Sequence, residues 1–199
     1  MANTLDQNHT SVSDGFEFIF GTNARKLMGM FFRAGASGPI SRASISLFRA
    51  GSPSDNMRLK VYDATNAAGS LSLPSATAII TSTTSVVGSG LPSYPSPVSL
   101  ANAPFVDFDF DGSASFVSGN YYLLSAERTG SYDDTDRYGW SATSSDTYAE
   151  GGQVAGDGNA TWATGSTLAN VSNNDQTFRT YYDPALGSSA GGNFLGFLM

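Results

Sequence analysis

The sequence predicts an all-β protein, an antiparallel jelly-roll-like β-sandwich of about 8–10 strands with extended terminal arms. Three observations lead to this prediction. No segment sustains the 3.6-residue apolar repeat of a helix over three turns. Glycine and proline, 22 and 8 of the 199 residues, recur too often for long helices. Short segments instead alternate apolar and polar residues, as half-buried strands do.

The predicted strands follow one another along the chain, separated by loops that contain Gly, Pro, Ser and Asn. In the third of them, Ala43, Ile45 and Leu47 share one face and Ser44 and Ser46 share the other. One face should therefore be core and the other wet. In chain order, the predicted strands cover residues 16–20, 26–32, 41–49, 58–62, 76–81, 105–110, 121–126, 137–141, 161–163 and 177–182.

The sixth predicted strand alternates carboxylates with apolar residues. Val106, Phe108 and Phe110 point one way, and Asp107 and Asp109 point the other. The same Asp-x-Asp-x-Asp-Gly run opens like a calcium-binding loop, but a serine stands where the bidentate glutamate should follow. We therefore expect a strand with a wet acidic face.

The chain divides into a central domain and two ends. Residues 1–15 are polar and predict an N-terminal arm, and residues 16–183 predict the sandwich. Residues 184–199 predict a Gly/Ser linker followed by an apolar tail. Within the domain, residues 82–104 hold four prolines and two glycines, which predicts a long surface loop because proline cannot donate to a sheet ladder.

The apolar tail predicts docking onto a partner or another subunit, because a finished sandwich cannot bury it. The alternative is that the tail returns to the sheet as one more strand. The predicted docking residues are Phe194, Leu195, Phe197, Leu198 and Met199.

Composition and charge argue against several classes of partner. The net charge is −7 and the ten Lys and Arg residues are scattered, which disfavours nucleic acid and anionic membrane surfaces. No run of about 18 apolar residues could span a bilayer. Cysteine is absent, which removes disulfides and thiolate metal sites.

The sequence also argues against an enzyme. His9 is the only histidine and lies in the polar N-terminal segment, which removes a Ser-His-Asp triad and a multi-histidine metal centre. No spacing among Glu17, Glu127, Glu150 and the aspartates recommends the acid pair of a glycosidase. We expect no catalytic residue and no required cofactor.

Aromatic residues in the last third of the chain predict a glycan site. Flat rings can pack on the apolar face of a sugar while nearby polar groups bond its hydroxyls. The alternative for each ring is packing in the core or on a sheet. The predicted glycan-binding residues are Tyr132, Tyr148, Trp162, Asp157 and Asn159.

An acidic loop in the same region allows a calcium site. Asp133, Asp134 and Asp136 could surround the ion with carboxylate and carbonyl oxygens. The alternative is solvated surface charge.

Other features have structural interpretations. Tyr138 and Trp140, two apart on one strand face, are expected in the core. Arg179 is expected to pair with an acidic neighbour or to lie along the sheet. The glycine-rich pieces at 151–152 and 156–158 lack the lysine of a phosphate loop and are expected to be turns.

Four pieces of the sequence resemble the choice-of-anchor R type of β-sandwich domain. They are the run from Ile40 to Pro53, the run from Arg58 to Asp63, the run from Gly119 to Leu124, and the closing series of Tyr-Gly-Gly, Trp and Phe-Arg motifs. The resemblance implies a jelly-roll-like sandwich used for display, adhesion or glycan binding in bacterial surface proteins or bacteriophage structural proteins. Because neither a signal peptide nor a surface anchor is present in this sequence, the bacteriophage role is the expected one.

These features predict a non-enzymatic bacteriophage virion structural protein, a capsid decoration or a tail or fibre accessory protein that displays the sandwich for adhesion or host-surface contact. We expect it in the virion, made in the host cytoplasm. Expected partners are other capsid or tail proteins, copies of itself and a cell-surface glycan, without nucleic acid or membrane. The alternative is a stand-alone carbohydrate-binding module of a bacterial surface or secreted protein.

Overall fold

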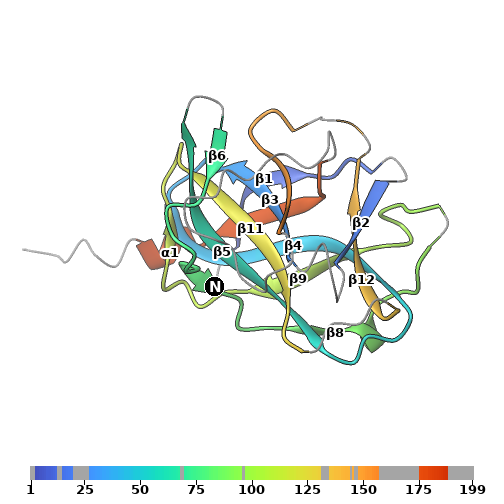
Figure 1. Cartoon of the computed structure of the whole chain (residues 1–199). Helices are drawn as coiled ribbons and strands as arrows, with labels where there is room; N and C mark the ends of the chain where they lie inside the picture. The colour runs from blue at the N-terminus through green and yellow to red at the C-terminus, as the bar shows by residue number, and fades with distance from the viewer. Residues whose placement is uncertain are drawn as a thin grey trace, which may run out of the picture.

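Antiparallel strands make up more than half of the residues that the structure describes (Figure 1). The computed structural model describes residues 3–12, 15–19, 27–67, 70–95, 97–130, 135–143, 145, 148–156 and 175–187. The elements are β1 (Thr4–His9), β2 (Gly15–Ile19), β3 (Leu27–Arg33), β4 (Gly38–Ala50), β5 (Asn56–Ala67), β6 (Ser70–Ser72), β7 (Ile80–Thr81), β8 (Val86–Val87), the 3-10 turn η1 (Gly88–Gly90), β9 (Phe105–Asp109), β10 (Ser115–Phe116), β11 (Tyr121–Arg128), β12 (Arg137–Ala142), β13 (Gly152–Gly156), β14 (Phe178–Tyr182) and α1 (Pro184–Gly187).

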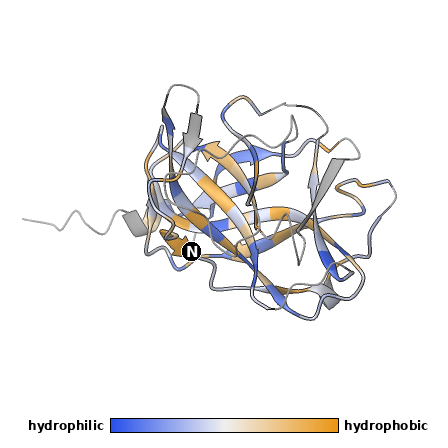
Figure 2. Cartoon of the chain, viewed as in Figure 1, coloured by the Kyte–Doolittle hydropathy of each residue, from blue (hydrophilic) through white to orange (hydrophobic). Residues whose placement is uncertain are grey.

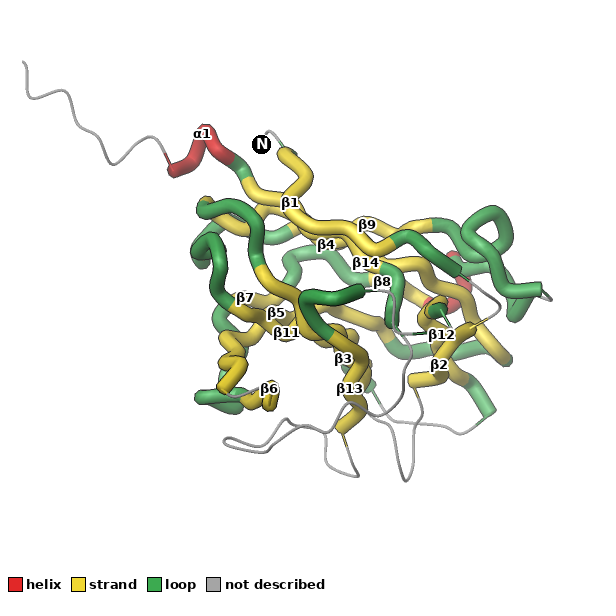
Figure 3. Tube along the Cα trace, turned by 90° about the horizontal axis from the view of Figure 1, so that it is seen from above, coloured by secondary structure: helices red, strands yellow, loops and turns green. Residues whose placement is uncertain are grey.

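The described strands form two seven-stranded sheets that pack face to face, which confirms the predicted all-β sandwich (Figure 3). The first sheet has the order β1-β14-β4-β12-β2, with β9 and β10 also paired to β4. The second has the order β13-β3-β11-β5-β6, with β7 and β8 also paired to β5. The rows β2-β12-β4-β9 and β3-β11-β5-β7 follow the order of a jelly roll, in which successive long strands alternate between the two sheets.

The core lies between the facing sides of the two sheets. Ile45 and Leu47 of β4 are fully buried there, as their alternation predicted. Tyr138 and Trp140 lie in the same core, which confirms their expected place, and the indole Nε1 of Trp140 donates to the carbonyl oxygen of Thr177 at 2.6 Å. Figure 2 shows hydrophobic segments along strands of both layers.

The predicted wet face of β4 is wrong. Ser44 and Ser46 are 1% and 0% exposed. The Ser46 hydroxyl donates to the carbonyl oxygen of Ala103 and accepts a hydrogen bond from the Ser141 hydroxyl, and the Ser44 hydroxyl donates to Asp107 Oδ1 at 2.6 Å. Because β4 is a central strand and the loop before β9 crosses this face, both faces are covered, and these serines stay polar by bonding locally.

The predicted N-terminal arm is also corrected. Residues 4–9 form β1, an edge strand that pairs antiparallel with β14. His9 ends this strand at 7% exposure, and its Nδ1–H donates to the carbonyl oxygen of Gln176 at 3.1 Å. An edge strand with one face in solvent has a polar sequence, which is why composition alone suggested an arm.

The remaining differences concern short or glycine-rich strands. Gly152 begins β13, which pairs with β3, although the sequence predicted a turn at that glycine pair. β6, β8 and β10 span two or three residues each, too few for an alternation to show. The predicted strand at 161–163 lies outside the described residues.

Candidate functional site

A β-bulge in β4 displaces one serine from the regular pattern of the first sheet. Opposite β4, Tyr181 pairs with Arg42 and Tyr182 pairs with Ile40, so Ser41 is the extra residue on the β4 side. Bulges redirect a side chain and occur often beside functional sites. Ser41 is 2% exposed, and its hydroxyl has no hydrogen-bond partner within the described part of the chain. Such a group costs about 1–3 kcal/mol and calls for an explanation.

A second bulge lies on the other side of β14. Asp6 is the extra residue of β1, and its Oδ1 accepts hydrogen bonds from the backbone N–H groups of Gly35 and Ala36 at 2.9 and 2.8 Å. The Thr180 hydroxyl donates to Oδ2 at 3.3 Å. Burial raises the pKa of Asp6 above its ordinary value, and these three hydrogen bonds offset only part of that effect. Asp6 therefore ties β1 to the β3–β4 turn.

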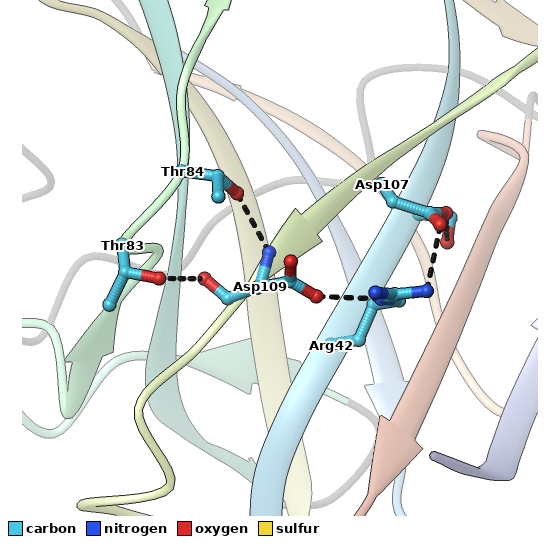
Figure 4. Close-up of polar contacts among 6 residues, drawn as sticks. Arg42, Thr83, Thr84, Asp107 and Asp109 are labelled. Carbon is cyan, nitrogen blue, oxygen red and sulfur yellow. Dashed lines mark hydrogen bonds and ion pairs between the residues drawn. The ribbon is translucent and has the colours of Figure 1, made fainter. Parts of the chain in front are cut away.

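Beside Ser41, Arg42 joins two carboxylates of β9 (Figure 4). Its Nε donates to Asp109 Oδ1 at 2.7 Å and its Nη1 donates to Asp107 Oδ2 at 2.9 Å. The hydrogen bond to Asp109 raises the pKa of Arg42. The side chains of Arg42, Asp107 and Asp109 are 30%, 51% and 44% exposed, so the wet acidic face predicted for this strand is confirmed.

The backbone of Asp109 is held from the side opposite β4. The Thr83 N–H and hydroxyl both donate to the Asp109 carbonyl oxygen, at 2.8 and 3.0 Å. The Asp109 N–H donates to Thr84 Oγ1 at 2.8 Å. Figure 4 shows the two threonines on one side of Asp109 and Arg42 on the other. The Asp109 carboxylate is therefore fixed in place on a rigid element.

Register places four residues in one row across the outer face of the first sheet. Leu5 is opposite Tyr181, Tyr181 is opposite Arg42, and Arg42 is opposite Asp109. Directly opposite residues share a face and lie close together. We call this row the Arg42 strip; it consists of Leu5, Tyr181, Arg42 and Asp109. Leu5 is 46% exposed, so the strip runs from an apolar and aromatic end to a charged end.

A surface hollow of about 350 Å³ opens next to the charged end of the strip. Asp111 lies at its edge, where the Ser113 hydroxyl and N–H lower the pKa of the Asp111 carboxyl. Phe110 also borders the hollow, but it is 1% exposed and offers no ring face. We call this surface hollow the Arg42 hollow. Its polar lining residues are Asn3, Ser41, Arg42, Thr83, Asp109 and Asp111.

Two other hollows have side chains that are already paired. One, of about 270 Å³, contains the exposed Arg33–Glu150 pair at 3.5 Å. Another, of about 410 Å³, is bordered by Arg49, Pro53 and Val87, and Arg49 Nε donates to the Leu91 carbonyl oxygen. The described residues that line these two hollows include no buried side-chain atom without a hydrogen bond, whereas the Arg42 hollow is lined by Ser41.

The structure places two of the predicted site residues. Tyr148 is 9% exposed, its ring centroid lies 5.2 Å from that of Phe178, and its hydroxyl donates to Gln7 Oε1 at 3.3 Å. Burial raises its pKa, and the ring faces the core instead of a sugar. Asp136 Oδ1 accepts a hydrogen bond from the Ser52 N–H at 2.6 Å, which ties the start of β12 to the β4–β5 turn.

The other predicted site residues lie outside the described residues. They are Tyr132, Asp133, Asp134, Asp157, Asn159, Trp162, Phe194, Leu195, Phe197, Leu198 and Met199. Across the part that the structure describes, no three His, Cys, Asp or Glu side chains form a group that could hold a metal ion.

Arg179 lies along the sheet, one of its two expected arrangements. Its Cζ is 4.1 Å from the centroid of the Phe105 ring, a cation–π contact. Sequence reasoning missed Ser41 and Arg42, although it singled out the alternating aspartates of β9. Only the strand register shows that Arg42 faces those aspartates.

No protein-family model matches this sequence, and a search of curated proteins found no match. Within the described residues, no helix has the length and apolar character needed to cross a membrane.

Proposed function

We propose that this chain is a non-enzymatic virion structural protein of a bacteriophage, a capsid decoration or a tail or fibre accessory protein. In this role the sandwich is displayed for adhesion to, or contact with, the host surface. The four residues of the Arg42 strip belong to strands that are paired within the sheet, so this face is rigid.

The Arg42 strip with its hollow is the observation that carries the binding role. Its groups are arranged as a recognition surface, with an apolar and aromatic end, a held ion pair and a buried hydroxyl that has no internal partner. Its carboxylates accept hydrogen bonds from an arginine or from backbone N–H groups, which suits positioning better than proton transfer.

The virion role is supported by sequence features. These are the choice-of-anchor R resemblance and the apolar end, which includes Phe194, Leu195 and Phe197. An apolar segment of this kind favours attachment to a partner.

Particle composition tests the virion role. We expect the full chain to copurify in a fixed ratio with a capsid or tail. A chain that ends at residue 187 should fold, as judged by circular dichroism, and should be absent from particles. Normal incorporation of the truncated chain would refute attachment through the tail, and absence of the full chain from purified particles would refute the virion role.

A stand-alone carbohydrate-binding module is the second candidate, and the Arg42 hollow is the observation that favours it. Such a module would bind a polysaccharide saturably without belonging to any particle. Glycan binding by a chain that is never found in particles would favour this candidate over the first.

A further inference from the structure

We propose that the Arg42 hollow binds a neutral saccharide and that its charge arrangement selects against acidic saccharides. This inference rests on the binding role proposed above and names the ligand class of that site.

Ser41 lines the hollow. Its side chain is almost fully buried, and its hydroxyl lacks a hydrogen-bond partner within the described part of the chain. The bulge places Ser41 at the border of the hollow, and it is a local irregularity in the central strand of the sheet. A hydroxyl can both donate and accept, so it suits a ligand hydroxyl of either orientation.

The residues around the hollow carry more negative than positive charge. Arg42 is the one cation among the lining residues, and both of its bonded carboxylates neutralise it. Asp111 adds another carboxylate that is held ionised by the Ser113 hydrogen bonds. Carboxylates accept hydrogen bonds from neutral hydroxyls, and they repel carboxylate, sulfate or phosphate groups. A polyhydroxylated, uncharged ligand fits this surplus of negative charge.

The Arg42 strip also has an aromatic end. Tyr181 is half-buried and lies opposite Arg42 on the same face of the sheet. An aromatic ring can pack against the apolar face of a pyranose while neighbouring polar groups form hydrogen bonds with the hydroxyls at the edge of the sugar. The adjacent Leu5, at 46% exposure, extends the apolar surface.

Binding assays with the purified full chain test the proposal. The probes are three neutral polysaccharides (dextran, mannan and xylan) and two acidic ones (alginate and polygalacturonate), measured by affinity electrophoresis and calorimetry. We expect at least one neutral polysaccharide to bind and neither acidic one to do so. Raising the salt concentration should leave the neutral affinity almost unchanged, because screening acts on charged ligands.

Ser41→Ala is the decisive variant, because removal of an unpaired hydroxyl leaves no group unsatisfied and should not impair folding. We expect it to weaken binding of the neutral polysaccharide roughly tenfold, the effect of one lost hydrogen bond. Ser46→Ala is the matched control on the same strand. Its hydroxyl is equally buried but already bonded to Ala103 and Ser141, so affinity should not change.

Several outcomes would overturn the proposal. These are preferential binding of an acidic polysaccharide, unchanged affinity in Ser41→Ala, or no binding of any neutral probe at millimolar sugar concentration. If no neutral probe binds but the chain copurifies with particles, this inference fails and the virion role stands. If a neutral probe binds through Ser41 but the chain is absent from particles, the virion role fails and the site stands.

Discussion

A buried ion pair ties the β4–β5 turn to the end of β11, and breaking it should destabilise the fold strongly. Arg128, the last residue of β11, donates to both carboxylate oxygens of Asp55, with Nη2–Oδ1 at 2.6 Å and Nε–Oδ2 at 2.8 Å. The two side chains are 1% and 8% exposed. Tyr138 of β12 donates its hydroxyl to the Asp55 carbonyl oxygen, and the Arg128 Cζ lies 5.4 Å from the Tyr138 ring centroid. The pair therefore ties the β4–β5 turn to β11 of the second sheet, and Tyr138 of β12 joins this cluster from the first sheet.

The expected size of the effect follows from this burial. Asp55→Ala leaves a desolvated guanidinium without its carboxylate, which should cost about 3–5 kcal/mol of unfolding free energy. For a chain of this length, each kcal/mol lowers Tm by about 2–4 °C, so Tm should fall by roughly 6–20 °C. The exposed Arg33–Glu150 pair is the control, since its side chains are 47% and 48% exposed and Glu150→Ala should cost about 0–1 kcal/mol.

Urea unfolding followed by tryptophan fluorescence measures both variants. The double variant Asp55→Leu with Arg128→Met should be more stable than Asp55→Ala alone, because it removes both charges from the interior. A cost below about 1 kcal/mol for Asp55→Ala, similar to that of Glu150→Ala, would refute the reasoning that burial makes this pair costly to break.

Three further predictions concern stability. Ser41→Ala should raise the unfolding free energy by about 1 kcal/mol, whereas Ser46→Ala should lower it by about 1–2 kcal/mol, as measured by urea unfolding; equal destabilisation by both would contradict an unpaired Ser41 hydroxyl. The folded-state pKa of Asp6 is raised, so ionisation of this carboxyl reduces stability as pH rises through that pKa. At pH 7, Asp6→Asn, which can still accept the two turn N–H bonds, should be at least as stable as the unmodified protein, and Asp6→Ala should be about 1 kcal/mol less stable. A higher melting temperature for Asp6→Ala than for Asp6→Asn would count against this account. Burial and the nearby Asp55 raise the pKa of Tyr138 from 10.0 to about 12, so the stability that this tyrosine contributes is lost as pH rises from 10 to 12. Tyr138→Phe should therefore flatten that part of the profile of unfolding free energy against pH, measured by circular dichroism. An unchanged profile in Tyr138→Phe would contradict this prediction.

The sequence by itself determined the fold class and much of the strand content. The alternation in residues 41–49 and 105–110 reports directly which side chains face the core, because the side-chain period of a strand is two. The same period correctly placed Tyr138 and Trp140 inside. These signals are local, so they can be interpreted without knowing which strands pair with each other.

Only the tertiary structure decided what covers the second face of β4, where β1 belongs and which residues meet at the Arg42 strip. Ser44 and Ser46 look like solvent-facing residues in the sequence, yet both are buried, and they bond to Asp107 of β9 and to Ala103 in the loop before it. Ser41 is also buried, but its hydroxyl has no hydrogen-bond partner within the described residues, and it lies at a bulge where the register of β4 against β14 shifts. Pairing between strands distant in sequence depends on register, and a one-residue shift changes the face of every following side chain, so no local pattern could have placed these groups together.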